Sequence, residues 1–485
     1  MTLKRVVRWL TLSLAAVAAW IGLSAPAQAI PVFARQTGHN CQACHISYPE
    51  LTAYGREFKL NGYTFGEAQP VPLALALMGE IDHVNQGKDV NTGTPTCTGS
   101  GGAGNPGPCN HLELVQYSIF YGGRLSENFG MFGQMSGGQF PVSNQGTFSP
   151  TADNTEFRYV WRIASEDSLV PDAVIGLNMN NNPTMQDVWA APAWRFPWFP
   201  YLPAGYGASA APYIDGNGGH NKVGIGAYAW VHKTWYAELN FYHSATGPLS
   251  FMNWGSGGTE QAMGDQPSDV LKGENPYYRL AYSQDWGYNS LEVGVFGINA
   301  KSYYCNPVGG GANPCATDPT AANKFNDIAV DAQYQYNRNE PWVFSAAGSY
   351  IHERNDLTAQ FIANGGAGNP NNILAKHTIN ELQLKATTYY NRQFGLTVGY
   401  SAITGTSDPA ALPPGSGPNG AGSATGDPRS NWWTFEFNFL PMQDLRFTVL
   451  YQMFTKINGG AGNFDGVGNN ASGQNRLTGA IWWVW

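Results

Sequence analysis

The sequence predicts an all-β fold, a transmembrane antiparallel β-barrel of about 16 strands with a short helical segment in front of it. Composition is the first support for this prediction. Only 12% of the 485 residues are charged, whereas 13% are aromatic and 59 are glycine, and an average soluble domain has about 25% charged residues. The mean hydropathy of −0.29 and the lack of long apolar runs beyond the N-terminus exclude a bundle of membrane helices. The aromatic content excludes a disordered chain.

The first 29 residues have the pattern of a secretory signal peptide. Lys4, Arg5 and Arg8 precede an apolar stretch over 10–23, and a small-residue cleavage site follows at 27–29. We therefore expect the mature chain to begin at Ile30 and to be exported to a compartment in which disulfides persist. The formal net charge of −8 at pH 7 argues against nucleic acid as a partner.

Residues 41–45, Cys-Gln-Ala-Cys-His, form a C-x-x-C-H motif. Two thiols at this spacing form thioethers with the porphyrin vinyl groups, and the adjacent imidazole binds the iron. The motif predicts one covalently attached haem c per chain, held by Cys41 and Cys44, with His45 as an axial ligand of the haem iron. The alternatives are a thioredoxin-like redox pair and half of a zinc site. The sequence lacks the βαβ pattern that accompanies a thioredoxin-like redox pair. It also lacks the further C-x-x-C that would complete a zinc site.

The other four cysteines fall into two pairs within loops rich in glycine and proline. Cys97 with Cys109, and Cys305 with Cys315, would each close a short loop. Disulfides that close such loops are common in exported proteins. We therefore expect two disulfides that staple surface loops.

Residues 30–70 form the predicted haem-binding segment. Residues 47–50, Ser-Tyr-Pro-Glu, match a helix capping box, and Asn61-Gly62 marks the end of a helix. Leu51, Tyr54 and Phe58 lie on one face of this predicted helix, where they would cover the porphyrin. A segment of about 40 residues is too short to bury a core of its own. The remaining walls of the haem site must therefore come from the rest of the chain.

From residue 71 to 485 the hydrophobic pattern has a period of two, as in strands with one polar and one apolar face. The pattern is clearest over 326–337, 379–390, 432–440 and 443–453. We expect the polar residues in these stretches to face the lumen and their aromatic and aliphatic neighbours to face lipid. Each stretch has about the 10 residues that a tilted strand needs to cross a bilayer.

Tight turns alternate with long loops of Gly, Asn, Pro and Ser, as in outer-membrane barrels with short periplasmic turns and long extracellular loops. About 16 or 17 strands are candidates, and we predict 16 because bacterial barrels have an even number. Both ends of the barrel then face the periplasm, and the aromatic stretch 478–485 is the expected closing strand. Tight turns are predicted near 167–171, Lys233, Trp286-Gly287, 339–341, Arg392-Gln393 and Pro441-Met442.

The segment around the haem motif resembles that of the outer-membrane monohaem cytochrome c–porin fusions, the ferrous-iron oxidases of acidophilic iron-oxidising bacteria. The resemblance is carried by IPVFARQTGHNCQACH at 30–45, PEL at 49–51 and YGREFKLNGY at 54–63. The remainder of the chain resembles this family in architecture only.

This resemblance implies an outer-membrane c-type cytochrome that oxidises extracellular Fe(II) to Fe(III) by one-electron transfer to its haem. The electron would pass to a periplasmic cytochrome c or copper protein, which makes the chain a ferrous-iron:cytochrome oxidoreductase. The haem segment would enter the barrel from the periplasmic side, with Cys41, Cys44 and His45 in the haem-binding roles. No catalytic side chain beyond the haem is expected. Two alternatives are a porin with a haem-bearing plug that is not an iron oxidase, and a conduit for another extracellular electron donor.

A methionine as sixth haem ligand would favour the high potential that electron transfer from Fe(II) in acid requires. Met78 is the candidate, because it shares the polar face of the first predicted strand with Glu80 and Asp82. Met131, Met135 and a histidine of the lumen are competing candidates, whereas His39 is expected to be too close to the motif to reach the opposite haem face. The acidic residues expected in the lumen could guide Fe(II), although the simpler interpretation is that they keep the lumen wet; they are Glu80, Asp82, Asp327, Asp331, Glu381 and Glu436.

Overall fold

The computed structural model describes residues 32–47, 50–84, 87–88, 95–96, 110–140, 151–164, 171–182, 184–189, 210–216, 222–252, 271–303, 322–338, 341–415 and 422–484. The predicted signal peptide and Cys97, Cys109, Cys305 and Cys315 lie outside these residues, so both expected disulfides remain predictions. Among the helices within these ranges, none is long and apolar enough to cross a membrane.

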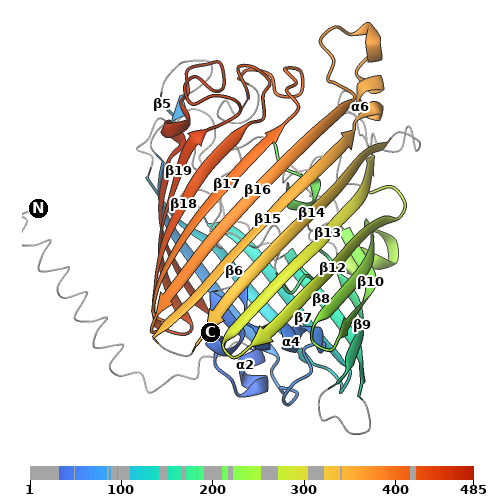
Figure 1. Cartoon of the computed structure of the whole chain (residues 1–485). Coiled ribbons are helices and arrows are strands. Elements are labelled where there is room, and N and C mark those ends of the chain that lie inside the picture. Colours follow the sequence, from blue (N-terminus) through green and yellow to red (C-terminus); the bar gives the residue numbers. More distant parts are fainter. Residues whose placement is uncertain are drawn as a thin grey trace, which may run out of the picture.

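Sixteen strands form one closed antiparallel barrel (Figure 1), which confirms the predicted fold class and strand number. Each strand pairs with the next in the series, and β20 closes the barrel against β3. The strands are β3 (Leu73–Val84), β6 (Asn110–Arg124), β7 (Phe129–Phe140), β8 (Thr151–Ile163), β9 (Ala173–Asn180), β10 (Lys222–Val231), β11 (Trp235–Ser244), β12 (Asn275–Trp286), β13 (Asn289–Tyr303), β14 (Ala322–Asn337), β15 (Trp342–Asp356), β16 (Lys376–Tyr390), β17 (Phe394–Gly405), β18 (Ser430–Met442), β19 (Leu445–Lys456) and β20 (Arg476–Val484).

Side chains alternate between the lumen and the outer face along these strands, as the sequence pattern predicts. In β14, Asp327 and Asp331 are 1% and 4% exposed, whereas Ile328 and Val330 are 51% and 53% exposed. The outer face of the barrel therefore carries an apolar belt, which is the arrangement that lipid requires of a transmembrane barrel.

Most tight turns within the described residues lie where the sequence places them. His232 and Lys233 both have positive φ, as do Asn391 and Arg392, and Gly287 supplies the positive φ between β12 and β13. The turn predicted at Pro441-Met442 is wrong by two residues, because Met442 still pairs with Leu445 across the turn. Proline lacks the N–H that a regular ladder needs, and the irregular register after Phe439 accommodates it inside β18.

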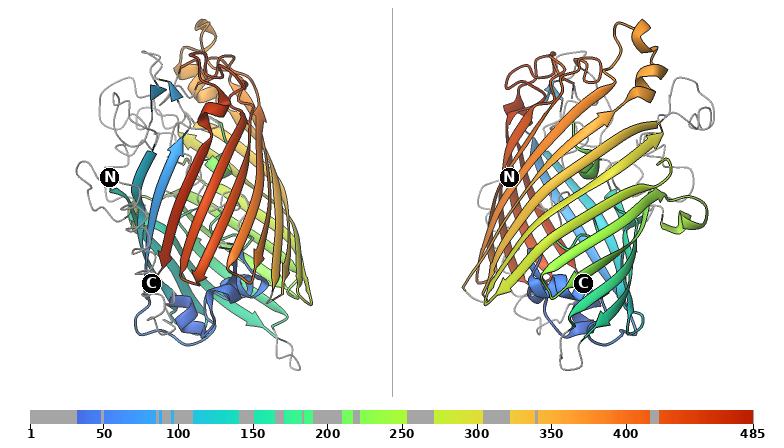
Figure 2. Two further views of the ribbon diagram at one scale, coloured as in Figure 1. Left: turned by 90° about the vertical axis from the view of Figure 1, so that its left-hand side faces the viewer. Right: turned by 45° about the vertical axis from the view of Figure 1, so that its right-hand side comes forward.

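The N-terminal segment lies at one end of the barrel, near the end of β20, and the helix of a long loop, α6 (Thr358–Ala363), lies at the other end (Figures 1 and 2). The segment contains α2 (Val32–Thr37), α3 (Cys41–Cys44), the strand pair β1 (His45–Ser47) and β2 (Glu50–Leu51), and α4 (Ala53–Leu60). The remaining short elements are β4 (Gly87–Lys88), β5 (Pro95–Thr96), α5 (Tyr213–Gly216) and the 3₁₀ turns η1 (Gly247–Met252), η5 (Gly366–Gly368) and η7 (Ala471–Gln474).

The predicted capping box at 47–50 is wrong, because Ser47 and Glu50 pair with each other in β1 and β2. The helix begins five residues later than this motif predicts, and Thr52 is its N-cap, accepting a hydrogen bond from the Gly55 N–H. The predicted helix end is confirmed, since Asn61 is the C-cap and Gly62 has a φ of +69°.

Candidate functional site

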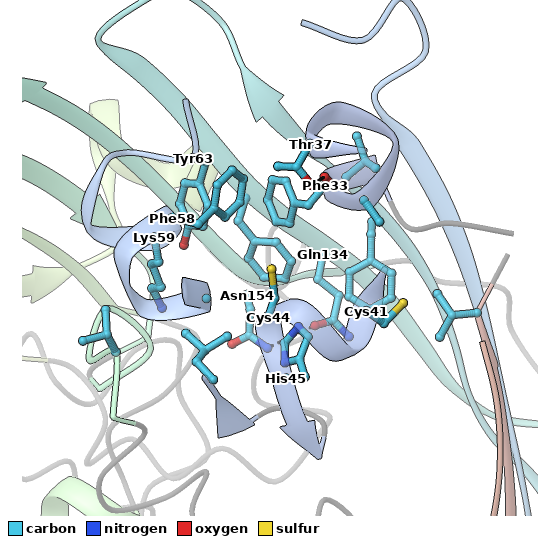
Figure 3. A pocket seen from close by; sticks show the side chains of 18 of the residues that line it. Phe33, Thr37, Cys41, Cys44, His45, Phe58, Lys59, Tyr63, Gln134 and Asn154 are labelled. Carbon is cyan, nitrogen blue, oxygen red and sulfur yellow. Dashed lines mark hydrogen bonds between the residues drawn. The ribbon is translucent and has the colours of Figure 1, made fainter. Parts of the chain in front are cut away.

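Helix α3 consists of the four residues of the C-x-x-C motif. Asn40 caps the helix, and its side chain accepts a hydrogen bond of 3.1 Å from the Ala43 N–H. A single helical turn brings residues three apart onto one side, so Cys41 and Cys44 both line one cavity. His45 follows in an extended conformation and also lines this cavity (Figure 3). The fold therefore brings the two thiols and the imidazole of the motif together.

The neighbouring helix and the barrel fix the position of α3. The Thr52 N–H donates to the Cys44 carbonyl at 2.8 Å. A Cβ at position 55 would lie only 2.3 Å from the same carbonyl oxygen, so Gly55 allows α4 to approach α3 this closely. On the barrel side, the Cys41 N–H donates to the side-chain carbonyl of Gln443 at 3.2 Å.

The cavity has a volume of about 270 Å³ and lies between the N-terminal segment and the barrel. Aromatic side chains from the N-terminal segment form one wall, where the rings of Phe33 and Tyr63 stack at 5.2 Å and Phe58 meets Phe33 edge-on at 5.1 Å (Figure 3). The barrel contributes Phe120, Phe132, Gln134, Asn154, Trp482 and Val484, and the chain after β9 contributes Thr184, Met185, Asp187 and Val188. The mainly apolar walls suit a porphyrin, and the borrowed barrel wall is what the short segment was predicted to need.

The state of Cys44 distinguishes this site from a thioredoxin-like redox pair. Burial, and after it the neighbouring Cys41, raises the pKa of the Cys44 thiol to about 12. Redox-active C-x-x-C motifs show the opposite shift, because they need a thiolate near neutral pH. Among the residues that the structure describes, no group of three or more His, Cys, Asp or Glu side chains could hold a metal ion.

A buried ion pair connects the N-terminal segment to the barrel. The Glu50 carboxylate lies 2.9 Å from the Lys385 ammonium of β16, and both side chains are less than 10% exposed. Ser345 and Gln335 donate further hydrogen bonds to Glu50. Burial alone would raise the pKa of Glu50, but Lys385, with Ser345 and Gln335, holds this pKa below its ordinary value. The carboxylate is therefore charged in the docked segment.

Helix α4 makes a second set of polar contacts with the lumen. The buried Arg56 guanidinium donates to Gln335 of β14 at 2.9 Å and also to Ser290 of β13. Lys59 lies 3.5 Å from Glu156, which is paired with Arg158 at 2.7 Å. Each buried cation of α4 thus has side-chain partners in the barrel.

The acidic residues proposed as Fe(II) guides form ion pairs or hydrogen bonds within the lumen wherever their side chains are described. Asp331 shares Arg279 with Asp187 and Glu292, and Glu436 is paired with Arg446 at 2.6 Å. The backbone N–H of Ile214 donates to Asp327, and Gln383 donates to Glu381. These contacts agree with the simpler interpretation of these acids as structural lumen residues; the side chains of Glu80 and Asp82 lie outside the described part.

The methionines named from the sequence do not line the described cavity. Met78 faces the lumen as predicted, but it packs in a cluster with Ala76, Leu450 and Trp482. Met131 and Met135 have the opposite strand parity to Phe132 and Gln134, which line the cavity, so they point away from it. Met185 lines the cavity instead. No periodic pattern marks Met185, because it lies in an irregular stretch after β9.

No protein-family model and no curated protein matches the sequence. Among solved structures, the chain is similar to the outer membrane channel DcaP of Acinetobacter baumannii, with 11% identity, 87% of this chain and 99% of that chain covered, and a TM-score of 0.42. It is also similar to OmpT, an outer membrane protein of Vibrio cholerae, with 10% identity, 86% of this chain and 97% of that chain covered, and a TM-score of 0.41. An anion-selective porin from Comamonas acidovorans is similar with 12% identity, 86% of this chain and 99% of that chain covered, and a TM-score of 0.43. TM-scores this low carry no argument about the function of this chain.

Replacing one partner of the buried ion pair should release the N-terminal segment from the barrel. Lys385→Met leaves the Glu50 carboxylate buried without a cation, which costs about 3 to 5 kcal/mol of docking free energy. Limited proteolysis of residues 32–60 in the detergent-solubilised protein measures docking, and heat-modifiable gel mobility shows that the barrel is intact. Lys233→Met is the control, because its pair with Glu57 is partly exposed and worth about 0 to 1 kcal/mol. Equal protease sensitivity of the two variants would contradict the role of the buried pair.

Docking of the segment should weaken in acid. The pKa of Glu50 is lower in the docked segment than in free solution, so its stabilising contribution is present above the ordinary carboxyl pKa of about 4.3. The contribution is lost as the pH falls through the lowered value. Pepsin protection of residues 32–60, measured between about pH 5 and pH 2, should decline in the wild type. The decline should be smaller in Glu50→Gln/Lys385→Met, and equal slopes would show that Glu50 is not the titrating group.

Proposed function

We propose that this chain is an outer-membrane electron-transfer protein that carries one haem c and oxidises extracellular Fe(II). The observation that carries the proposal is that Cys41, Cys44 and His45 line one mainly apolar cavity, closed jointly by the N-terminal segment and the barrel. The donor, Fe(II), comes from the resemblance of residues 30–63 to the cytochrome c–porin fusions.

The outer membrane as location is supported by the barrel itself. The closed barrel has no free strand edge, and its outer face is apolar along the strands. The N-terminal segment lies at the end of the barrel where β3 begins and β20 ends (Figure 1). In outer-membrane barrels this end faces the periplasm, so the cavity lies where a soluble periplasmic carrier could approach it.

The residues of the cavity have separate roles in this proposal. Cys41 and Cys44 would form the thioethers, and the His45 imidazole would bind the iron. Phe33, Phe58 and Tyr63 exclude water from one side of the cavity, and burial of this kind is among the factors that set a haem potential. When bound, the haem supplies a one-electron iron couple.

The reaction needs no acid–base side chain. One electron leaves Fe(II), which becomes Fe(III), and the same electron leaves the protein to a periplasmic cytochrome c or copper protein. No atom and no proton is transferred to the chain, so the absence of a recognisable catalytic triad from the sequence is consistent with this chemistry. The chain acts by holding the redox group in place and by connecting an extracellular donor, Fe(II), with a periplasmic acceptor that it does not meet.

Covalent haem attachment should depend on the motif. In cells that express a cytochrome c maturation system, the wild type should carry one haem per chain by pyridine haemochrome assay and should stain for haem in a denaturing gel. Cys41→Ser/Cys44→Ser should lose the stain, because no thioether can form. Cys305→Ser/Cys315→Ser should keep it and is the matched cysteine control. A wild type without covalent haem would refute the proposed function.

Fe(II) should reduce the haem of the purified protein. The Soret and α bands of the ferric protein, mixed with Fe(II) in acidic buffer, should change to those of the ferrous form faster than in buffer alone. Haem that is attached but not reduced would refute Fe(II) as the donor and would favour another extracellular donor. Solute diffusion through liposomes that carry the protein, combined with no Fe(II) reduction, would favour a porin with a haem-bearing plug.

A further inference from the structure

The chain after β9 turns inwards and forms part of the cavity that holds the C-x-x-C-H motif. The Asn181 side chain accepts a hydrogen bond of 2.7 Å from the Thr155 N–H, and Asn182 donates to Asn154 at 3.0 Å. Thr184, the next described residue, has a φ of +77°, a conformation that a β-branched residue adopts only when its surroundings enforce it. Thr184 and Met185 both line the cavity.

Three consecutive residues of this turn are each held by a different cation from outside it. The Lys59 ammonium donates to the Met185 carbonyl, and the Arg158 guanidinium donates to the Gln186 carbonyl. The Asp187 carboxylate lies 3.3 Å from the guanidinium of Arg279. Because Arg158 and Arg279 are fully buried, these contacts hold the chain at Met185 and at the two residues that follow it. The side chain is thereby presented to the cavity by a rigid turn.

Few of the described side chains that line the cavity could bind a haem iron besides His45. His39, Lys59 and Met185 are the lining residues with a suitable nitrogen or sulfur atom. His39 is exposed, packs against the ring of Tyr54, and lies only two residues before Cys41. Lys59 is engaged by Glu156 and by the Met185 carbonyl. Met185 is 9% exposed, and it comes from the barrel and not from the segment that carries His45.

We propose that the Met185 thioether is the second axial ligand of the haem. This inference rests on the proposed function, because it requires haem at Cys41 and Cys44. A neutral thioether in a buried site suits the iron, and His/Met ligation gives a higher potential than ligation by two nitrogens. Met78 is the alternative from the sequence, but it lies beside Trp482 across the β3–β20 ladder and, unlike Trp482, does not line the cavity. In this arrangement the motif supplies one axial ligand and the barrel supplies the other.

Spectroscopy of the haem-loaded protein tests the assignment. The ferric wild type should be low-spin and should show the weak sulfur-to-iron charge-transfer band, and its ferrous form should bind carbon monoxide poorly. Met185→Leu, which keeps the side-chain volume, should lose this band, become high-spin and bind carbon monoxide, with an unchanged haem content. Met78→Leu is the matched control and should behave as the wild type.

Met185→His is a second variant, which tests the assignment by the appearance of a new spectrum and not by the loss of the charge-transfer band. It should give the spectrum of a bis-imidazole haem and a lower reduction potential. A wild type without the charge-transfer band, or Met185→Leu with a wild-type spectrum, would overturn the assignment while haem attachment and Fe(II) reduction could still hold. Loss of the band in Met78→Leu, with the band kept in Met185→Leu, would assign the ligand to Met78 and overturn it too. A wild type without covalent haem would overturn both this inference and the proposed function.

Discussion

The site depends on buried ion pairs and hydrogen bonds between the N-terminal segment and the barrel, each of which is incomplete without the other. A charge buried without a partner costs several kcal/mol, and a pair of buried charges is tolerated only when hydrogen bonds complete it. Glu50 of the N-terminal segment finds Lys385, Ser345 and Gln335 of the barrel, and Arg56 finds lumen side chains of β13 and β14. Removing the segment would leave a cation in the lumen without its anion, and removing the barrel would leave the segment without a core. The docked position of the C-x-x-C turn follows from these pairs.

The topology of the barrel then decides which side chains meet that turn. An even number of antiparallel strands returns the chain to the end at which it began, so β20 ends beside the start of β3. The N-terminal segment directly precedes β3, and it must lie at this same end. For this reason Trp482 and Val484, more than 430 positions further along the chain, line the cavity together with Cys41. Strand parity brings residues from both ends of the sequence to the same end of the barrel, and the buried pairs then fix the segment there.

Strand number, strand faces and most tight turns were predictable, because the period-two pattern and the turn residues are local signals. That Cys41, Cys44 and His45 would meet at one cavity was predictable for the same reason, since the motif has a fixed spacing. The N-terminal end of α4 was not, because two residues that match a capping box, Ser47 and Glu50, instead pair across a short hairpin and Glu50 is used for Lys385. Met185 was missed since its position comes from Arg158, Arg279 and Lys59, which lie far apart in the sequence and carry no common pattern.

The buried charges of the lumen also connect the barrel wall to the cavity. Arg279 is fully buried among Asp187, Glu292 and Asp331, and Glu156 is fully buried between Arg158 and Lys59. Breaking one such buried pair costs about 3 to 5 kcal/mol. Because Lys59, Arg158 and Arg279 also hold the turn that carries Met185, the same charged groups that pair within the lumen build the barrel-side wall of the cavity at Cys41, Cys44 and His45.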